Sequence, residues 1–204
     1  MSFAEKCYEI FERSVDDYHL REGKKKDAPN PFGADTLEYC LYEKNRVDSL
    51  QWHLEDRMRA PLIEPREALE IKRRIDALNQ WRTALVEQLD DRFAEEFRKI
   101  PCAPDAPLNT ESLGWALDRL SILSIRVYHM REESMRYEAG GDHCAECVRR
   151  LSLLLEQRDD LVSAIDRLRA DVLAGCRRVK VYRQMKMYND PDLNPVLYRK
   201  KKEE

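Results

Sequence analysis

The sequence lacks the long apolar runs that export and membrane insertion require. Its first residues, MSFAEKCYEIFERS, hold no apolar run of signal-peptide length, and charged residues interrupt every later apolar stretch. A signal peptide needs about 7–15 apolar residues and a spanning helix about 20, so neither is expected. The six cysteines are scattered and do not resemble a compact secreted disulfide framework, so we expect a reducing, cytoplasmic location.

Glycine is also scarce, and the charge is nearly balanced. There are 6 Gly in 204 residues, while 37% of the residues are charged and 43% are hydrophobic, a balance typical of helix-rich soluble proteins. The formal net charge of -3 excludes a protein that binds polyanions over its whole surface. No segment alternates apolar and polar residues with the period of a half-buried strand. We therefore predict an all-α protein.

Apolar spacing and capping residues predict about five helices. Ser2 with Glu5 and Asp35 with Glu38 have the spacing of capping boxes, and Pro65 suits a helix start. Asn109 or Thr110 would cap the fourth helix and Asp142 the fifth. The expected bounds of the first three helices are about 2–20, 35–58 and 66–99. The fourth would run from its cap at 109 or 110 to about 137, and the fifth from about 142 to 182.

The connections between these helices predict an up-and-down antiparallel bundle with two long members, the third and the fifth. We expect residues 1–175 to form the bundle. Residues 176–204 would be a basic, tyrosine-containing helix end and strap of the same domain.

Three of the four histidines occur in one repeated five-residue phrase: an aromatic, the histidine, an aliphatic, a charged residue and an acid. The copies are YHLRE at 18–22, WHLED at 52–56 and YHMRE at 128–132. On a helix the histidine and the acid three positions on lie on one face, so each copy presents an imidazole beside a carboxylate. The repetition predicts a shared structural role.

Two interpretations of this phrase stay open. If two or three copies meet inside the bundle, they would form a site suited to Zn, Mn or Fe, with Glu55 or Glu133 as a base for hydrolysis. Otherwise the aromatic and aliphatic residues pack, while each histidine and acid form a partly exposed pair of small energetic value. The candidate metal ligands are His53, Asp56, His129, Glu132, Asp118 and His19.

Periodicity separates the three histidines. Ile122 and Ile125 give the fourth helix a second apolar side that also carries Asp118 and His129, so we expect both to be partly buried in a central helix. His53 lies away from the apolar stripe of its helix, and His19 lies near a helix end. We therefore expect the distance between the side-chain nitrogens of His53 and His129 to decide whether the phrases share one site.

Two further groups are candidate binding residues. His143, Cys144 and Cys147 are zinc-ligand types, although the cysteine spacing also fits the apolar seam of the fifth helix. Arg82 and Arg158 take seam positions in the two long helices. There they would either clamp an anionic small molecule or rest their stems on the seam and meet nearby acids.

The long third and fifth helices favour protein–protein or self-association, with a homodimer through these helices as one form. The tail from Cys176 interleaves basic residues with tyrosines, a pattern that fits single-stranded nucleic acid. Its turn-rich NDPDLNP segment carries acids and favours a strap docked through residues 196–198 instead. Neither nucleic acid nor a membrane is therefore an expected partner.

Several segments together resemble a known group of proteins. They are WHLED, NTESLGWALDRLSIL, VYHMREE, LLLEQRDDL and VYRQMKMYNDPDLNPVLY. The chain resembles, over nearly its whole length, a family of bacterial proteins catalogued only as a domain of unknown function. The resemblance implies a bacterial, cytoplasmic, helical protein. It implies no activity, cofactor or catalytic residue.

Overall fold

The computed structural model describes residues 1–20, 29–185 and 190–200, and these ranges are helical with no strand. The helices are α1 (Phe3–His19), α2 (Leu37–Met58), α3 (Pro65–Phe97), α4 (Leu113–Ser134), the short 3-10 helix η1 (Tyr137–Ala139), α5 (Gly141–Leu173) and α6 (Pro195–Lys200). The all-α prediction is confirmed. None of the helices in these ranges is long and apolar enough to cross a membrane.

Local sequence explains where most helices begin. Ser2 and Glu5 form the predicted capping box of α1, and Pro65 is the first residue of α3. The caps of α2 and α4 were predicted one to three residues too early. Thr36 accepts a hydrogen bond from the Tyr39 amide at 3.1 Å, and Ser112 accepts one from the Trp115 amide at 3.3 Å.

The predicted ends of α5 were wrong. Gly140, and not Asp142, is the residue before the helix, and α5 ends at Leu173 instead of continuing to about residue 182. Gly175 adopts a φ of 69°, which favours glycine and ends the helix. An alanine Cβ there would lie 2.2 Å from the Pro101 carbonyl oxygen, so the chain crosses the preceding loop too closely for a side chain.

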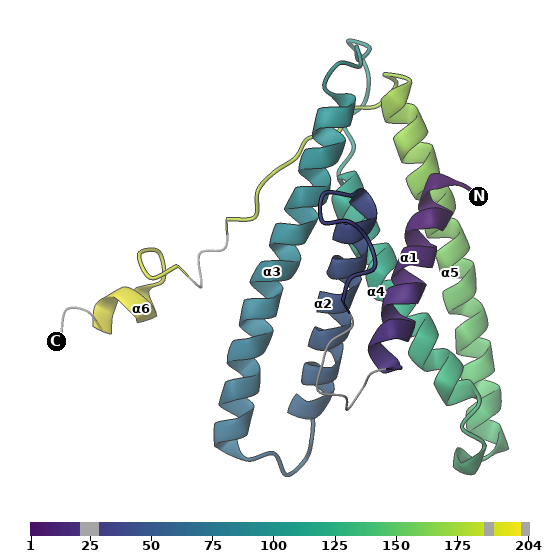
Figure 1. Cartoon of the computed structure of the whole chain (residues 1–204), viewed down its shortest axis with the longest axis vertical. Helices are drawn as coiled ribbons and strands as arrows, with labels where there is room; N and C mark the ends of the chain where they lie inside the picture. The colour runs from purple at the N-terminus through teal and green to yellow at the C-terminus, as the bar shows by residue number, and fades with distance from the viewer. Residues whose placement is uncertain (21–28, 186–189, 201–204) are drawn as a thin grey trace.

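Two antiparallel hairpins, α2–α3 and α4–α5, form the bundle, and α1 packs against α2, α4 and α5 (Figure 1). α3 and α5 flank the molecule, while α4 is central and packs against all four other long helices. The central position predicted for α4 is confirmed. The main core draws on all five and includes Phe11, Leu41, Leu89, Leu117 and Ile165.

The segment after α5 is a strap that returns across the bundle to α3 (Figure 1). Arg178 pairs with the 107–109 loop through two backbone hydrogen bonds of 2.8 and 2.9 Å. Arg183 then contacts Asp91 at 2.6 Å and Glu87 at 3.3 Å on α3. The docking predicted for residues 196–198 was wrong, because Val196, Leu197 and Tyr198 are exposed. Tyr188 and Asn189 of the predicted strap lie outside the described residues.

A candidate metal centre of three histidines

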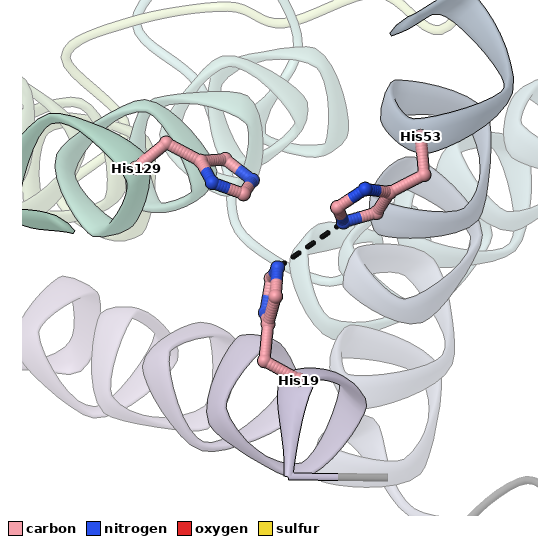
Figure 2. A group of neighbouring side chains, drawn as sticks. All are labelled: His19, His53 and His129. Atoms are coloured by element: carbon pink, nitrogen blue, oxygen red, sulfur yellow. Dashed lines mark hydrogen bonds between the residues drawn. The ribbon is translucent and has the colours of Figure 1, made fainter. Parts of the chain in front are cut away.

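The three histidines of the repeated phrase come together from three helices. His19 is the last residue of α1, His53 lies in α2 and His129 in α4, and Figure 2 shows their ring nitrogens pointing toward one shared space. The two Nε2 atoms of His19 and His53 are 3.1 Å apart. One nitrogen from each of the three rings lies within 4.8 Å of the others. His19, expected to be peripheral, is a full member of the cluster.

Hydrogen bonds outside the cluster fix which nitrogens face its centre. The His19 Nδ1 lies 2.8 Å from the Val15 carbonyl oxygen, which can only accept, so Nδ1 carries the hydrogen. The His129 Nδ1 lies 3.0 Å from the Glu132 carboxylate, which likewise accepts. In the neutral rings, Nε2 of both residues is then a bare acceptor. The His129 Nε2 is buried and has no hydrogen-bond partner.

The aromatic residue of each phrase stacks on the histidine of another phrase. Tyr18 stacks on His53, with ring centroids 5.0 Å apart. Trp52 stacks on His129 at 5.3 Å, and Tyr128 stacks on His19 at 4.2 Å. The stacking therefore runs from α1 to α2, from α2 to α4 and from α4 back to α1. It orients all three imidazoles and explains why an aromatic precedes each histidine.

This geometry fits a small transition-metal ion. Zinc–imidazole bonds are about 2.0–2.1 Å long, so two ligands of a tetrahedral ion lie about 3.3–3.4 Å apart, close to the 3.1 Å observed between His19 and His53. All three histidines are intermediate in exposure. Three protein ligands with a fourth position left to solvent is the arrangement of catalytic zinc sites.

The structure places one of the three predicted ligand acids beside the histidines and the other two away from them. Glu132 belongs to the site, because it accepts from His129 and holds that ring. The other two acids lie elsewhere. Asp56 is exposed and lies 3.8 Å from Arg59, while Asp118 is buried in a separate ion network.

That network connects α2, α3 and α4 inside the bundle. Lys44, which is fully buried, contacts both Asp48 and Asp118, the latter at 2.8 Å. Arg82 pairs with Asp118, and Ser121 donates to Asp48 at 2.6 Å. Burial raises the pKa of Asp48 above the usual aspartate range, although Lys44 opposes the shift. Two cations thus face two carboxylates, of which Lys44, Asp48 and Asp118 are buried and Arg82 is partly exposed.

Sequence analysis missed Lys44 and Asp48. A Lys and an Asp four residues apart usually form a surface pair. The available signal was the polar side of α2, where Asn45 and Ser49 accompany them, opposite Ser121 and Ser124 on α4. Asn45 donates to both of those serine hydroxyls at 3.0 Å.

The structure does not bring the two candidate anion-binding arginines together. Arg82 lines a pocket of about 430 Å³ whose walls also include Asp48, Trp52 and Ile122. Arg158 lines a different pocket of about 780 Å³, where it pairs with Asp159 and lies 5.6 Å from the centre of the Tyr8 ring. Each arginine therefore has acidic partners of its own.

Comparison with known proteins places the chain in a family without giving an activity. A family model described as "Protein of unknown function (DUF4254)" matches residues 38–181, more than half of the chain. The chain belongs to this family. The matched residues include His53 and His129, whereas His19 lies before them. Neither the curated proteins nor the solved structures include a match to this chain.

Proposed function

We propose that this protein binds one divalent transition-metal ion through His19, His53 and His129 and uses it for hydrolytic chemistry. The observation that carries the proposal is the convergence of three imidazole nitrogens, of which the buried His129 Nε2 has no partner. A buried acceptor without a donor costs about 1–3 kcal/mol, and a bound cation removes that cost. Zn²⁺ suits the three nitrogens best, and Mn²⁺ or Fe²⁺ are the alternatives.

The surrounding residues orient the ligands. The Val15 carbonyl and the Glu132 carboxylate accept from the outer nitrogens of His19 and His129, so the inner nitrogens stay free to bind. The stacked aromatic rings restrict the rotation of each imidazole. A zinc ion held this way, with an open position, lowers the pKa of its bound water and so supplies a nucleophile at neutral pH.

The alternative role, in which each histidine only pairs with its acid, has less support. His129 contacts Glu132 of its own phrase, whereas Asp56 of the second phrase is more than half exposed, and Glu22 of the first phrase lies outside the described residues. The His19 and His53 rings instead face each other through Nε2. Because His19 Nε2 is an acceptor in the neutral ring, His53 must be the donor when no ion is present. A cation between them replaces this single hydrogen bond with two coordinate bonds.

Metal content tests the proposal. Untagged wild-type protein, dialysed against zinc and then desalted, is expected to hold one equivalent of zinc more than His53→Ala. His129→Ala is expected to lose the same equivalent, and the double variant no further metal, because both side chains share one ion. Glu146→Gln is the control and should keep the wild-type zinc content, since its side chain pairs with Arg149 and Arg150 outside this cluster. A His53→Ala protein with as much zinc as wild type would reject the site.

Activity tests the hydrolytic part separately. Zinc-loaded wild type is expected to hydrolyse members of a panel of phosphate esters and amides, and His53→Ala is expected to be inactive. If loaded wild-type protein turns over none of them, the three histidines hold a structural ion and the hydrolase proposal fails.

Self-association is a second candidate function, favoured by the exposed apolar side chains on α5. Val148 and Leu153 are 51% and 65% exposed on this flanking helix. We propose that the side of α5 that carries Leu153 pairs with a second copy of the chain. Analytical ultracentrifugation checks it: wild type should be a dimer that Leu153→Lys converts to monomer, and a monomeric wild type would reject the idea. Anion binding by Arg82 and Arg158 has the least support, because the two line separate pockets.

A further inference from the structure

A second cluster of metal-ligand side chains lies where α4 turns into α5. Glu133 comes from the last turn of α4, and His143 and Cys147 lie one turn apart at the start of α5. The His143 Nε2 is 2.9 Å from a Glu133 carboxylate oxygen and 3.5 Å from the Cys147 Sγ. One ligand atom from each of the three residues lies within 4.8 Å of the others.

Both neighbours approach the same nitrogen of His143. In a proton relay the two ring nitrogens contact different groups, one the nucleophile and the other the orienting acid. Here Glu133 and Cys147 both face Nε2. A single imidazole N–H cannot satisfy both at once, whereas a cation at the centre of the three ligand atoms contacts all of them. The arrangement therefore fits metal binding better than nucleophilic catalysis.

Of the two cysteines in the Cys-x-x-Cys pattern, the buried one belongs to this cluster. Cys147 is 6% exposed, and its burial places the sulfur between the two helices. Cys144, the other half of the Cys-x-x-Cys pattern, donates instead to the Arg136 carbonyl oxygen at 3.4 Å. The third candidate ligand beside His143 and Cys147 is therefore Glu133, and not Cys144 as the sequence pattern suggested. Arg136 pairs with Glu133 at 2.9 Å and lies 3.4 Å from the His143 Nε2, so a metal ion at the centre would take the place of this half-exposed guanidinium.

We propose that Glu133, His143 and Cys147 form a second zinc site, with water as the fourth ligand, that fastens the α4–α5 turn. Thiolate, imidazole and carboxylate are all zinc ligands, and the thiolate favours zinc over manganese. Binding exchanges the thiol proton for a sulfur–zinc bond and releases that proton to solvent. Apolar packing adds little at this turn, because Met135 and Tyr137 are 53% and 79% exposed.

Cobalt substitution tests this site independently of the three-histidine site. Co²⁺ bound to a thiolate gives a charge-transfer band in the near ultraviolet, and the three-histidine site holds no sulfur. Untagged wild type loaded with Co²⁺ is expected to show the band. Cys147→Ser and His143→Ala should both reduce it to baseline, and Cys144→Ser, the matched control, should leave it unchanged. His53→Ala should also leave it unchanged.

Each other outcome overturns the proposal. A wild type without the band holds no thiolate-bound metal. A band that survives in Cys147→Ser comes from another cysteine, such as the exposed Cys102 or Cys176. A band that disappears in Cys144→Ser means that the pair in the Cys-x-x-Cys pattern binds the metal instead. Glu133→Gln, a substitution outside the buried core, provides a further check and should weaken cobalt binding about 10-fold or more.

Discussion

At the scale of single residues, polar side chains on different helices depend on one another for their contacts and for the balance of charge. The His129 ring depends on Glu132 from its own helix, and it is covered by Trp52 from α2. Lys44 depends on two carboxylates from two helices. Removing one member of either group should therefore affect the members that remain.

Glu132→Gln should weaken zinc binding about 10- to 100-fold, because the neutral amide oxygen accepts from His129 more weakly than the carboxylate and no longer raises the basicity of the ring. Competition with a chromophoric chelator measures the affinity. Glu146→Gln is the control, since Glu146 also follows a histidine by three residues but pairs with Arg149 and Arg150. Equal losses in the two variants would show that Glu132 acts only through its charge.

Lys44→Met should lower the free energy of unfolding by about 3–5 kcal/mol, because Asp48 and Asp118 keep only Arg82 as a cation inside the bundle. Lys72→Met is the matched control. Lys72 and Asp76 form a pair of the same spacing, but the two side chains are 56% and 37% exposed, so a loss below about 1 kcal/mol is expected. Urea unfolding measures both. A similar small loss in the two variants would contradict the structural role of the network.

At the scale of helices, the close contact between α3 and α4 depends on one glycine and one aspartate. A Cβ at Gly114 would lie 2.6 Å from the Asp90 carboxylate and 2.8 Å from the Val86 carbonyl oxygen. Asp90 itself accepts from the Ser112 hydroxyl at 2.7 Å and from the Gly114 amide at 2.8 Å. The start of α4 is thereby fastened to α3.

Gly114→Ala should lower the free energy of unfolding by about 1–3 kcal/mol, because α3 and α4 must move apart to admit the methyl group. Gly141→Ala provides the comparison at another helix start, where nothing lies within 4 Å of the added Cβ. Removing glycine there should leave stability unchanged or raise it by up to about 1 kcal/mol. Thermal and urea unfolding should separate the two, and equal effects would contradict the close contact.

Burial raises the pKa of Asp90 above its usual range, although its two hydrogen-bond donors oppose the shift. The folded state therefore binds more protons than the unfolded state once the pH exceeds the ordinary aspartate pKa of about 3.9. The contribution of Asp90 to stability must then fall as the pH rises through this window.

Asp90→Asn removes this titration. The stability difference between wild type and Asp90→Asn should shift against wild type as the pH rises from about 3 toward neutrality. Urea unfolding of both proteins at a series of pH values measures it. A difference that stays constant, or that shifts toward wild type, would mean that burial does not raise the pKa of Asp90.

Helix positions were predictable from sequence wherever local signals decide them. The starts of α1 and α3 follow from Ser2 with Glu5 and from Pro65. The end of α5 was not predictable, because it depends on Gly175 crossing the 101–102 backbone, a contact between segments far apart in the chain. Periodicity also placed α4 at the centre, because its two apolar sides require neighbours on both.

At the scale of the whole molecule, the candidate metal centre exists only in the folded bundle. His19 and His53 are 34 residues apart, and His129 comes from a third helix. The three phrases are visible in the sequence. The sequence could not show, however, that each aromatic stacks on the histidine of a different helix. It also assigned Asp118 to the site, because helical periodicity gives the side of a helix and not the partner that faces it.

The same dependence on folding means that a metal ion at this centre would join α1, α2 and α4. A ligand that binds only the folded state stabilises it in proportion to the logarithm of its concentration over its dissociation constant. α1 would contribute one of these ligands, His19, from outside the residues matched by the family model.

Anomalous diffraction from crystals of the zinc-loaded protein tests the three-histidine centre most directly. We predict a zinc peak about 2.0–2.1 Å from the Nε2 atoms of His19, His53 and His129. A structure in which these three rings are ordered as here, in the presence of excess zinc, with His53 still hydrogen-bonded to His19 and no zinc between them, would contradict the account.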